Sequence, residues 1–194
     1  YWGDIEGTAV QALWDDPRFP DSPDMVGAVF SFNSRDIFPD DSNDNYGATI
    51  EGYVTPTESG DYDFFLRSDD ASELWISTDD TEANLFLEAE ETACCNAFQE
   101  PGADQTTIIP VGLVAGQEYG FLFLVKEGGG GDWGQVAWRK DGDTTAAASL
   151  PPIQGLILKG MADTGGGSIE ITKEPYAISE DPVPDDTMVE GRPA

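Results

Sequence analysis

Short apolar stretches separated by glycine and proline run from about residue 47 to residue 139, and this rhythm constrains the fold most strongly. In residues 61–67, for example, Tyr62, Phe64 and Leu66 fall on one face of an extended strand. The 22 glycines and 13 prolines lie between such stretches and form no repeat. We therefore expect an all-β protein, a sandwich or barrel of short strands with few and short helices.

The expected strands follow one another at short intervals, at residues 48–55, 61–67, 73–77, 85–89, 106–111, 118–125 and 134–139. The turn-forming residues 56–60 predict that the first two strands form a β-hairpin. Earlier in the chain, we expect one helical turn over residues 8–13, capped by Thr8, and long loops whose aromatic residues pack onto a sheet. A chain of 194 residues with 39% hydrophobic residues can bury one sizeable core, so one main domain is expected.

The charge balance is strongly acidic, with 38 acidic residues against 9 basic ones and a formal net charge of -29. Such a surface repels phosphate backbones and anionic lipids, which makes nucleic acid and membrane surfaces poor partners. No apolar run is long enough for membrane insertion. Divalent cations are suitable partners, although solubility accounts for most of the acidic residues and only a few carboxylates are expected to bind metal.

The chain contains no histidine, which excludes Ser-His-Asp and Cys-His nucleophile systems and zinc sites that need histidine. Carboxylate chemistry remains, either in a glycosidase or in a site for calcium. The two cysteines, Cys94 and Cys95, are adjacent. Their Cα atoms should lie about 3.8 Å apart, below the usual disulfide range, so both a vicinal disulfide and two reduced thiols stay open. Neither arrangement provides a zinc or CxxC redox site.

An aspartate pair, Asp69–Asp70, lies in the short link between two expected strands. Adjacent side chains of an extended strand point to opposite sides, so aiming both carboxylates at one ion requires an unusual backbone such as a cis peptide. Aspartate pairs recur in this chain as turn formers, and we interpret the acidic runs at residues 40–45 and 79–80 as turns.

A glycine-rich loop, Gly128 to Gly131, is flanked by Glu127 and Asp132. Four consecutive glycines are entropically costly to order, which indicates that the backbone approaches something closely. Carboxylates at both ends add oxygen ligands of the kind that calcium takes. The alternative is a flexible hairpin loop.

Together these segments resemble the PA14 family over residues 1–152. The matching motifs, in chain order, are residues 44–47, 52–56, 59–64, 68–76 and 126–138. The resemblance implies an antiparallel β-sandwich with long loops, in which Asp69 and Asp70 match the cis-linked pair that holds Ca²⁺ in sugar-binding members. The glycine-rich loop resembles the family's second calcium-binding loop. By this resemblance the metal ligands are Asp69, Asp70, Asp132, Glu127 and the backbone oxygens of Gly129, Gly130 and Gly131, and the ligand-binding residues are Asp69, Asp70, Asp132 and Trp133.

The sequence thus predicts a calcium-dependent carbohydrate-binding module of an extracellular or cell-surface protein, with glycans as partners and no catalytic residues. A calcium-stiffened structural spacer and a carboxylate-based glycosidase are the alternatives. Residues 153–194 are expected to be an extension, either a linker or the first strand of a following Ig-like repeat. We expect the chain to be part of a larger multidomain protein. Trp133 has two expected roles, packing on a sugar ring or packing in the core.

Overall fold

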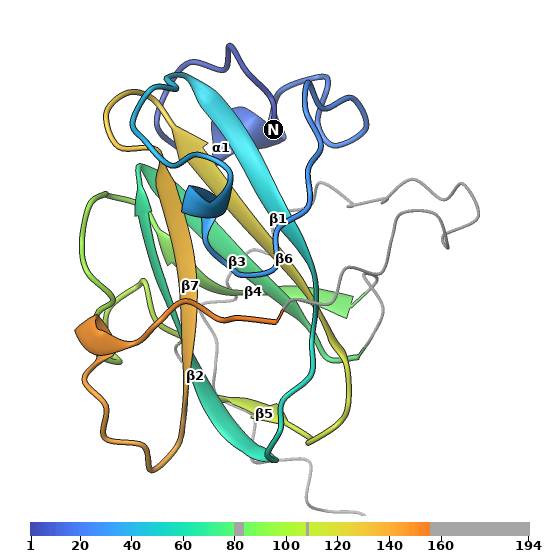
Figure 1. Ribbon diagram of the computed structural model, residues 1–194, viewed down its shortest axis with the longest axis vertical. Helices are drawn as coiled ribbons and strands as arrows, with labels where there is room; N and C mark the ends of the chain where they lie inside the picture. The colour runs from blue at the N-terminus through green and yellow to red at the C-terminus, as the bar shows by residue number, and fades with distance from the viewer. Residues whose placement is uncertain (80–83, 108, 156–194) are drawn as a thin grey trace, which may run out of the picture.

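A computed structural model of the chain describes residues 1–79, 84–107 and 109–155, which form a sandwich of two β-sheets (Figure 1). The strands are β1 (Tyr46–Val54), β2 (Gly60–Asp69), β3 (Ala71–Ser77), β4 (Leu85–Glu91), β5 (Val111–Leu113), β6 (Tyr119–Glu127) and β7 (Trp133–Lys140). One sheet has the order β1-β6-β3-β4 and the other the order β5-β2-β7, and all of these pairs are antiparallel. The expected fold class, an all-β antiparallel sandwich with long loops, is confirmed.

The main core lies between the two sheets. Phe64 and Leu66 of β2 contribute to it from the three-stranded sheet, while Leu74 of β3 and Phe123 of β6 contribute from the four-stranded sheet, all four with no exposed surface. Burying each such side chain contributes about 1.5–3 kcal/mol. The alternation of apolar residues along β2 therefore faces this core, as the sequence predicts.

Irregular segments cover the outer faces of both sheets. Trp2, Leu13 and Phe19, from the first twenty residues, pack on Leu122 and Leu124 of β6. This second layer explains why all nine residues of β6 are buried. On the three-stranded sheet a third cluster packs around residues of β2 and β7, and its members are Phe65, Phe98, Ala137, Ala147 and Leu150.

The predicted hairpin of residues 48–55 and 61–67 is wrong. β1 pairs with β6 over nine residues, whereas β2 pairs with β5 and β7 in the other sheet. The link at residues 55–59 therefore changes sheets and does not reverse the chain within one. Alternating strands satisfy either pairing equally well, because both leave one face on the core.

Three smaller expectations also need correction. Helix α1 (Gln11–Trp14) begins after Val10 and has no side-chain cap, so Thr8 does not cap it. The strand expected at residues 106–111 is shifted to β5, and Thr106 makes only an isolated bridge with Phe65. Residues 156–194, including the expected Ig-like start, lie outside the described residues.

Candidate functional site

Two crossovers between the sheets lie at the same end of the sandwich (Figure 1). The chain leaves the three-stranded sheet at Asp69 and enters the four-stranded sheet at Ala71, and it returns through residues 128–132, between β6 and β7. The register places Asp69 opposite Trp133 and Ala71 opposite Lys126. The aspartate pair and the glycine-rich loop, separated by almost sixty residues of sequence, are therefore neighbours.

Three carboxylates converge at this end. Asp69, Asp70 and Glu127 each place one carboxylate oxygen within 4.8 Å of the other two. The Asp69–Asp70 peptide bond is cis, as the family resemblance implies. Asp70 Oδ2 accepts a hydrogen bond of 3.0 Å from the Gly128 N–H, and Asp69 Oδ2 accepts one of 3.0 Å from the Gly131 N–H. The loop thus fixes both aspartates through its backbone.

Close packing at the loop explains its glycines. A Cβ atom on Gly131 would lie 2.5 Å from Asp69 Oδ2, and one on Gly128 would lie 2.9 Å from Thr8 Cγ2. Gly130 has a φ of +129°, a conformation that side chains disfavour. The loop is therefore held against the aspartates and is not a free hairpin loop.

Glu127 is the most unusual residue of the cluster. It has no exposed surface, and neither carboxylate oxygen has a hydrogen-bond partner in the structure. Burial, followed by the negative charges of Asp70, Asp69 and Asp132, raises the pKa of Glu127 to about 8, and the nearby Gly129 N–H opposes this shift.

Burial is also the main cause of a raised pKa at Asp69. The adjacent Lys126 is buried as well, but its Nζ donates to the backbone oxygens of Gly7 and Glu127, at 2.5 and 2.6 Å. The lysine therefore adds positive charge nearby without pairing directly with a carboxylate of the cluster.

Asp132, expected to be a metal ligand, lies outside the group of three carboxylates but close by. Its side chain is fully buried, Oδ2 accepts a hydrogen bond of 2.6 Å from the Asn43 N–H, and Oδ1 has no partner. Its own N–H donates to Asp41 Oδ1. The buried Tyr46 hydroxyl lies beside Asp132, so the surroundings of this carboxylate are polar as well as buried.

The segment at residues 41–45, interpreted from the sequence as a turn, is part of this site. In addition to the Asn43 and Asp41 contacts, the Asn45 N–H donates to the Gly128 carbonyl oxygen at 3.2 Å, and Asn45 has a φ of +55°. The run of acidic and amide side chains there was the available signal, but its spacing gave no indication that it folds over a distant loop.

The cluster fits a hard divalent cation. Three carboxylates lie close together, one of them fully buried and lacking hydrogen bonds, and the nearby Lys126 donates to backbone oxygens and not to them. A bound cation would stabilise the ionised form of such a group. Oxygen-only ligands of this type suit Ca²⁺ better than a transition metal.

Trp133, the remaining predicted ligand-binding residue, is half-buried at the start of β7. Its ring lies 5.7 Å from the guanidinium carbon of Arg67, which also lies 4.7 Å from the centre of the Phe98 ring. Arg67 therefore lies near both aromatic rings, and the Trp133 side chain, which is next to Asp69, stays partly accessible to solvent.

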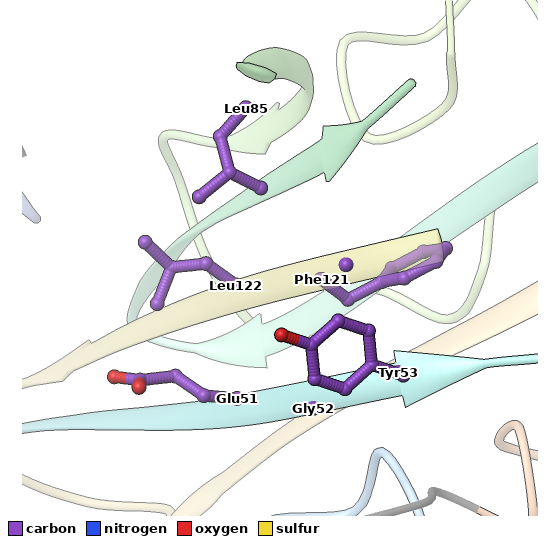
Figure 2. A pocket seen from close by; sticks show the side chains of 7 residues that line it. Glu51, Gly52, Tyr53, Leu85, Phe121 and Leu122 are labelled. Atoms are coloured by element: carbon purple, nitrogen blue, oxygen red, sulfur yellow. The ribbon is translucent and has the colours of Figure 1, made fainter. Parts of the chain in front are cut away.

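A separate shallow pocket lies on the four-stranded sheet, at β1, β4 and β6 (Figure 2). Its side chains include Tyr53, Leu85 and Leu122, and Glu51 is its one carboxylate. It contains none of the predicted site residues. Within the described part of the chain, no helix is both long and apolar enough to span a membrane.

The PA14 domain family model matches residues 13–149. Among curated proteins, the mouse N-acetyl-beta-glucosaminyl-glycoprotein 4-beta-N-acetylgalactosaminyltransferase 1 is 34% identical over 100 residues, which are 49% of this chain and 10% of the transferase. The aligned part therefore spans about a tenth of that relative.

Two similar solved structures are epithelial adhesin A domains from Candida glabrata, each in complex with Galβ1-3GlcNAc. Epa9A is 16% identical, with a TM-score of 0.37, over 56% of this chain and 52% of that chain. Epa6A is 15% identical, also with a TM-score of 0.37, over 57% and 47%. The chain thus spans about half of each adhesin domain. Because the family match covers well over half of this sequence, the chain belongs to the PA14 domain family.

Proposed function

We propose that this PA14 domain is a non-catalytic, calcium-dependent carbohydrate-binding module. The observation that carries the proposal is Glu127, a fully buried carboxylate without a hydrogen-bond partner, within 4.8 Å of oxygen atoms of Asp69 and Asp70. A bound cation would stabilise the ionised form of such a buried carboxyl group, and the family to which the chain belongs includes members that bind sugars through calcium.

In this proposal Asp69, Asp70 and Glu127 hold the ion. Calcium takes six to eight oxygen ligands, so Asp132 Oδ1 and backbone oxygens of Gly129, Gly130 and Gly131 are the candidates that complete its shell. When bound, calcium supplies a positive centre at which vicinal sugar hydroxyls can replace water. The protein residues fix the carboxylates through the loop N–H groups, and Trp133 offers an aromatic face beside them.

The burial of Glu127 argues against the glycosidase alternative. A glycosidase needs a carboxylic acid that reaches the leaving oxygen of the substrate, and Glu127 has the raised pKa of such an acid. However, its side chain has no exposed surface and so cannot reach a substrate. Sugar hydrolysis by the purified chain would contradict the non-catalytic assignment.

The proposed setting is an extracellular or cell-surface protein with several domains. Free calcium is abundant outside cells, and glycans on surfaces and in polysaccharides present many copies of one sugar. Single sites of this type bind weakly, and linked copies gain affinity through effective concentration.

Binding to a broad glycan array, in calcium and again with a chelator, tests the proposal. We expect a signal on particular sugars that disappears with the chelator. Asp69→Asn should abolish both calcium binding and glycan binding, whereas Asp61→Asn, an exposed position at the other end of β2, should change neither. Glycan binding that persists in the chelator would refute the calcium-dependent mechanism.

A calcium-stiffened spacer is the second candidate, because Asp69 and Glu127 end strands of different sheets. An ion held by both would tie the sheets together. This candidate predicts that calcium raises the melting temperature while the folded, calcium-loaded chain binds no glycan.

A further inference from the structure

A vicinal disulfide lies directly beside the candidate site. Cys94 and Cys95 are bonded to each other, and their two sulfur atoms and one carboxylate oxygen of Asp69 all lie within 4.8 Å of one another. Because both sulfurs are oxidised, they are not available as thiolate metal ligands. Cys94 is half-buried and Cys95 is exposed, so the disulfide borders the site and remains accessible to a ligand.

The backbone fixes this disulfide against β2. The Cys95 N–H donates to the Ser68 carbonyl oxygen at 2.8 Å, and Cys95 has a φ of +71°. Just before it, the Ala93 N–H donates to Oε1 of Glu91, a residue with 1% exposure at the end of β4. Phe98 anchors the segment after the disulfide in the third core cluster. The position of the disulfide next to Asp69 is therefore set by the fold on both sides.

Asp69 thus has two apolar neighbours. One is the disulfide, and the other is Trp133, which pairs with Asp69 in the strand register. A pocket that orients a small polar ligand typically combines apolar walls with a few convergent polar groups. Sulfur is polarisable and packs well against C–H groups. A sugar ring has the matching chemistry, with hydroxyls around its edge and C–H groups on its faces.

We propose that the Cys94–Cys95 disulfide is a sugar-contacting wall of the site. It packs against the C–H face of a pyranose whose hydroxyls point toward the carboxylate cluster, and it selects against sugars with a bulky substituent on that face. This inference rests on the proposed carbohydrate-binding function and deepens it. It assigns sugar selectivity to a pair of residues that make no metal contact.

The test compares the wild-type chain with Cys94→Ser/Cys95→Ser and with the control Thr92→Ala, an exposed position in the same segment. In saturating calcium, titration calorimetry with methyl glucoside, galactoside, mannoside and fucoside gives the sugar affinity. Calorimetry with calcium alone gives the metal affinity. We expect the double variant to lose about tenfold or more in affinity for the preferred sugar while its calcium affinity stays within twofold, and the control to match the wild type.

Reducing the wild-type chain with a phosphine keeps the inference testable if the double variant folds poorly. With circular dichroism confirming that the fold is retained, reduction should weaken sugar binding and reoxidation should restore it. Unchanged sugar affinity in the reduced or substituted chain would overturn the inference while leaving the proposed function intact. A wild-type chain that binds calcium but none of the glycans would refute the proposed function itself, and this inference with it.

Discussion

Replacing Gly131 with alanine perturbs the site where its packing is tightest. The added Cβ would lie 2.5 Å from Asp69 Oδ2 and 2.9 Å from Trp133 Nε1, distances that a real methyl group does not occupy. Either the loop or the Asp69 carboxylate must move, and the 3.0 Å hydrogen bond from the Gly131 N–H to Asp69 is then lost. We therefore expect the variant to hold Asp69 in the wrong position for a cation.

The hydrogen bond gives the expected size of the effect. A hydrogen bond to a charged group contributes about 1.5–3 kcal/mol. If that stabilisation is lost from the metal-bound geometry, calcium affinity should fall by about 10- to 150-fold, since about 1.4 kcal/mol corresponds to a factor of ten. Titration calorimetry with calcium measures this directly, and thermal unfolding with and without calcium checks it through linkage.

Gly129→Ala is the matched control two residues away. A Cβ there would lie 3.5 Å from Asp44 Oδ1, which is ordinary van der Waals contact. The control should bind calcium within about twofold of wild type by the same arithmetic. A folded Gly131→Ala variant with wild-type calcium affinity would refute the claim that the loop positions Asp69. Equal losses in both variants would show that general glycine flexibility, and not the close contact, governs the site.

Three further predictions concern residues outside the carboxylate cluster. Burial raises the pKa of Glu88 from 4.5 to about 7, so the folded state favours the protonated side chain. The contribution of Glu88 to the free energy of unfolding is therefore full below pH 4.5 and is lost as the pH rises through 7. Glu88→Gln should be more stable than wild type by about 1–2 kcal/mol at pH 8, after discounting for solvent screening, and equal at pH 4 in urea titrations. Lys126→Met should leave the Gly7 carbonyl oxygen without its hydrogen-bond donor and lower the free energy of unfolding by about 1–3 kcal/mol. Urea unfolding in calcium measures this change, and an unchanged unfolding midpoint would contradict it. Leu13→Ala should destabilise the chain by about 2–5 kcal/mol in the same assay, because Leu13 is fully buried against Gly47; a loss under 1 kcal/mol would show that the N-terminal cover is dispensable.

The local pattern of residues was enough to predict the strands but not their partners. Alternation in residues 61–67 predicts the face that β2 buries, and the structure confirms it. Which strand lies beside β2 depends on the link at residues 55–59, and its turn-forming composition suits a reversal within a sheet and a crossing between sheets alike. Pairing is decided by contacts between segments far apart in sequence, as for β6, which pairs with β1 and β3 at its edges and is buried on both faces.

The candidate site was predictable where its residues are adjacent in sequence. The Asp69–Asp70 pair and the glycine-rich loop each carried a local signal, and the structure brings them together. The contribution of residues 41–45 was missed because it depends on a contact between segments about 90 residues apart. The complete burial of Glu127 was also missed, because two charged residues, Lys126 and Glu127, follow the apolar run of β6 and suggest an exposed strand end.

The position of the site at the sheet crossovers links metal binding to the integrity of the sandwich. Asp69 ends a strand of the three-stranded sheet, and Glu127 ends a strand of the four-stranded sheet. A cation bound by both would hold the two sheets at a fixed distance, and without it the mutual repulsion of the carboxylates would act across the crossover. Calcium affinity and thermal stability should therefore fall together in variants of the cluster. The Cys94–Cys95 disulfide lies beside Asp69 and is not expected to bind the ion, so its removal should change sugar selection without this coupled loss. The two kinds of variant thus separate the role of the fold in holding an ion from its role in shaping a sugar site.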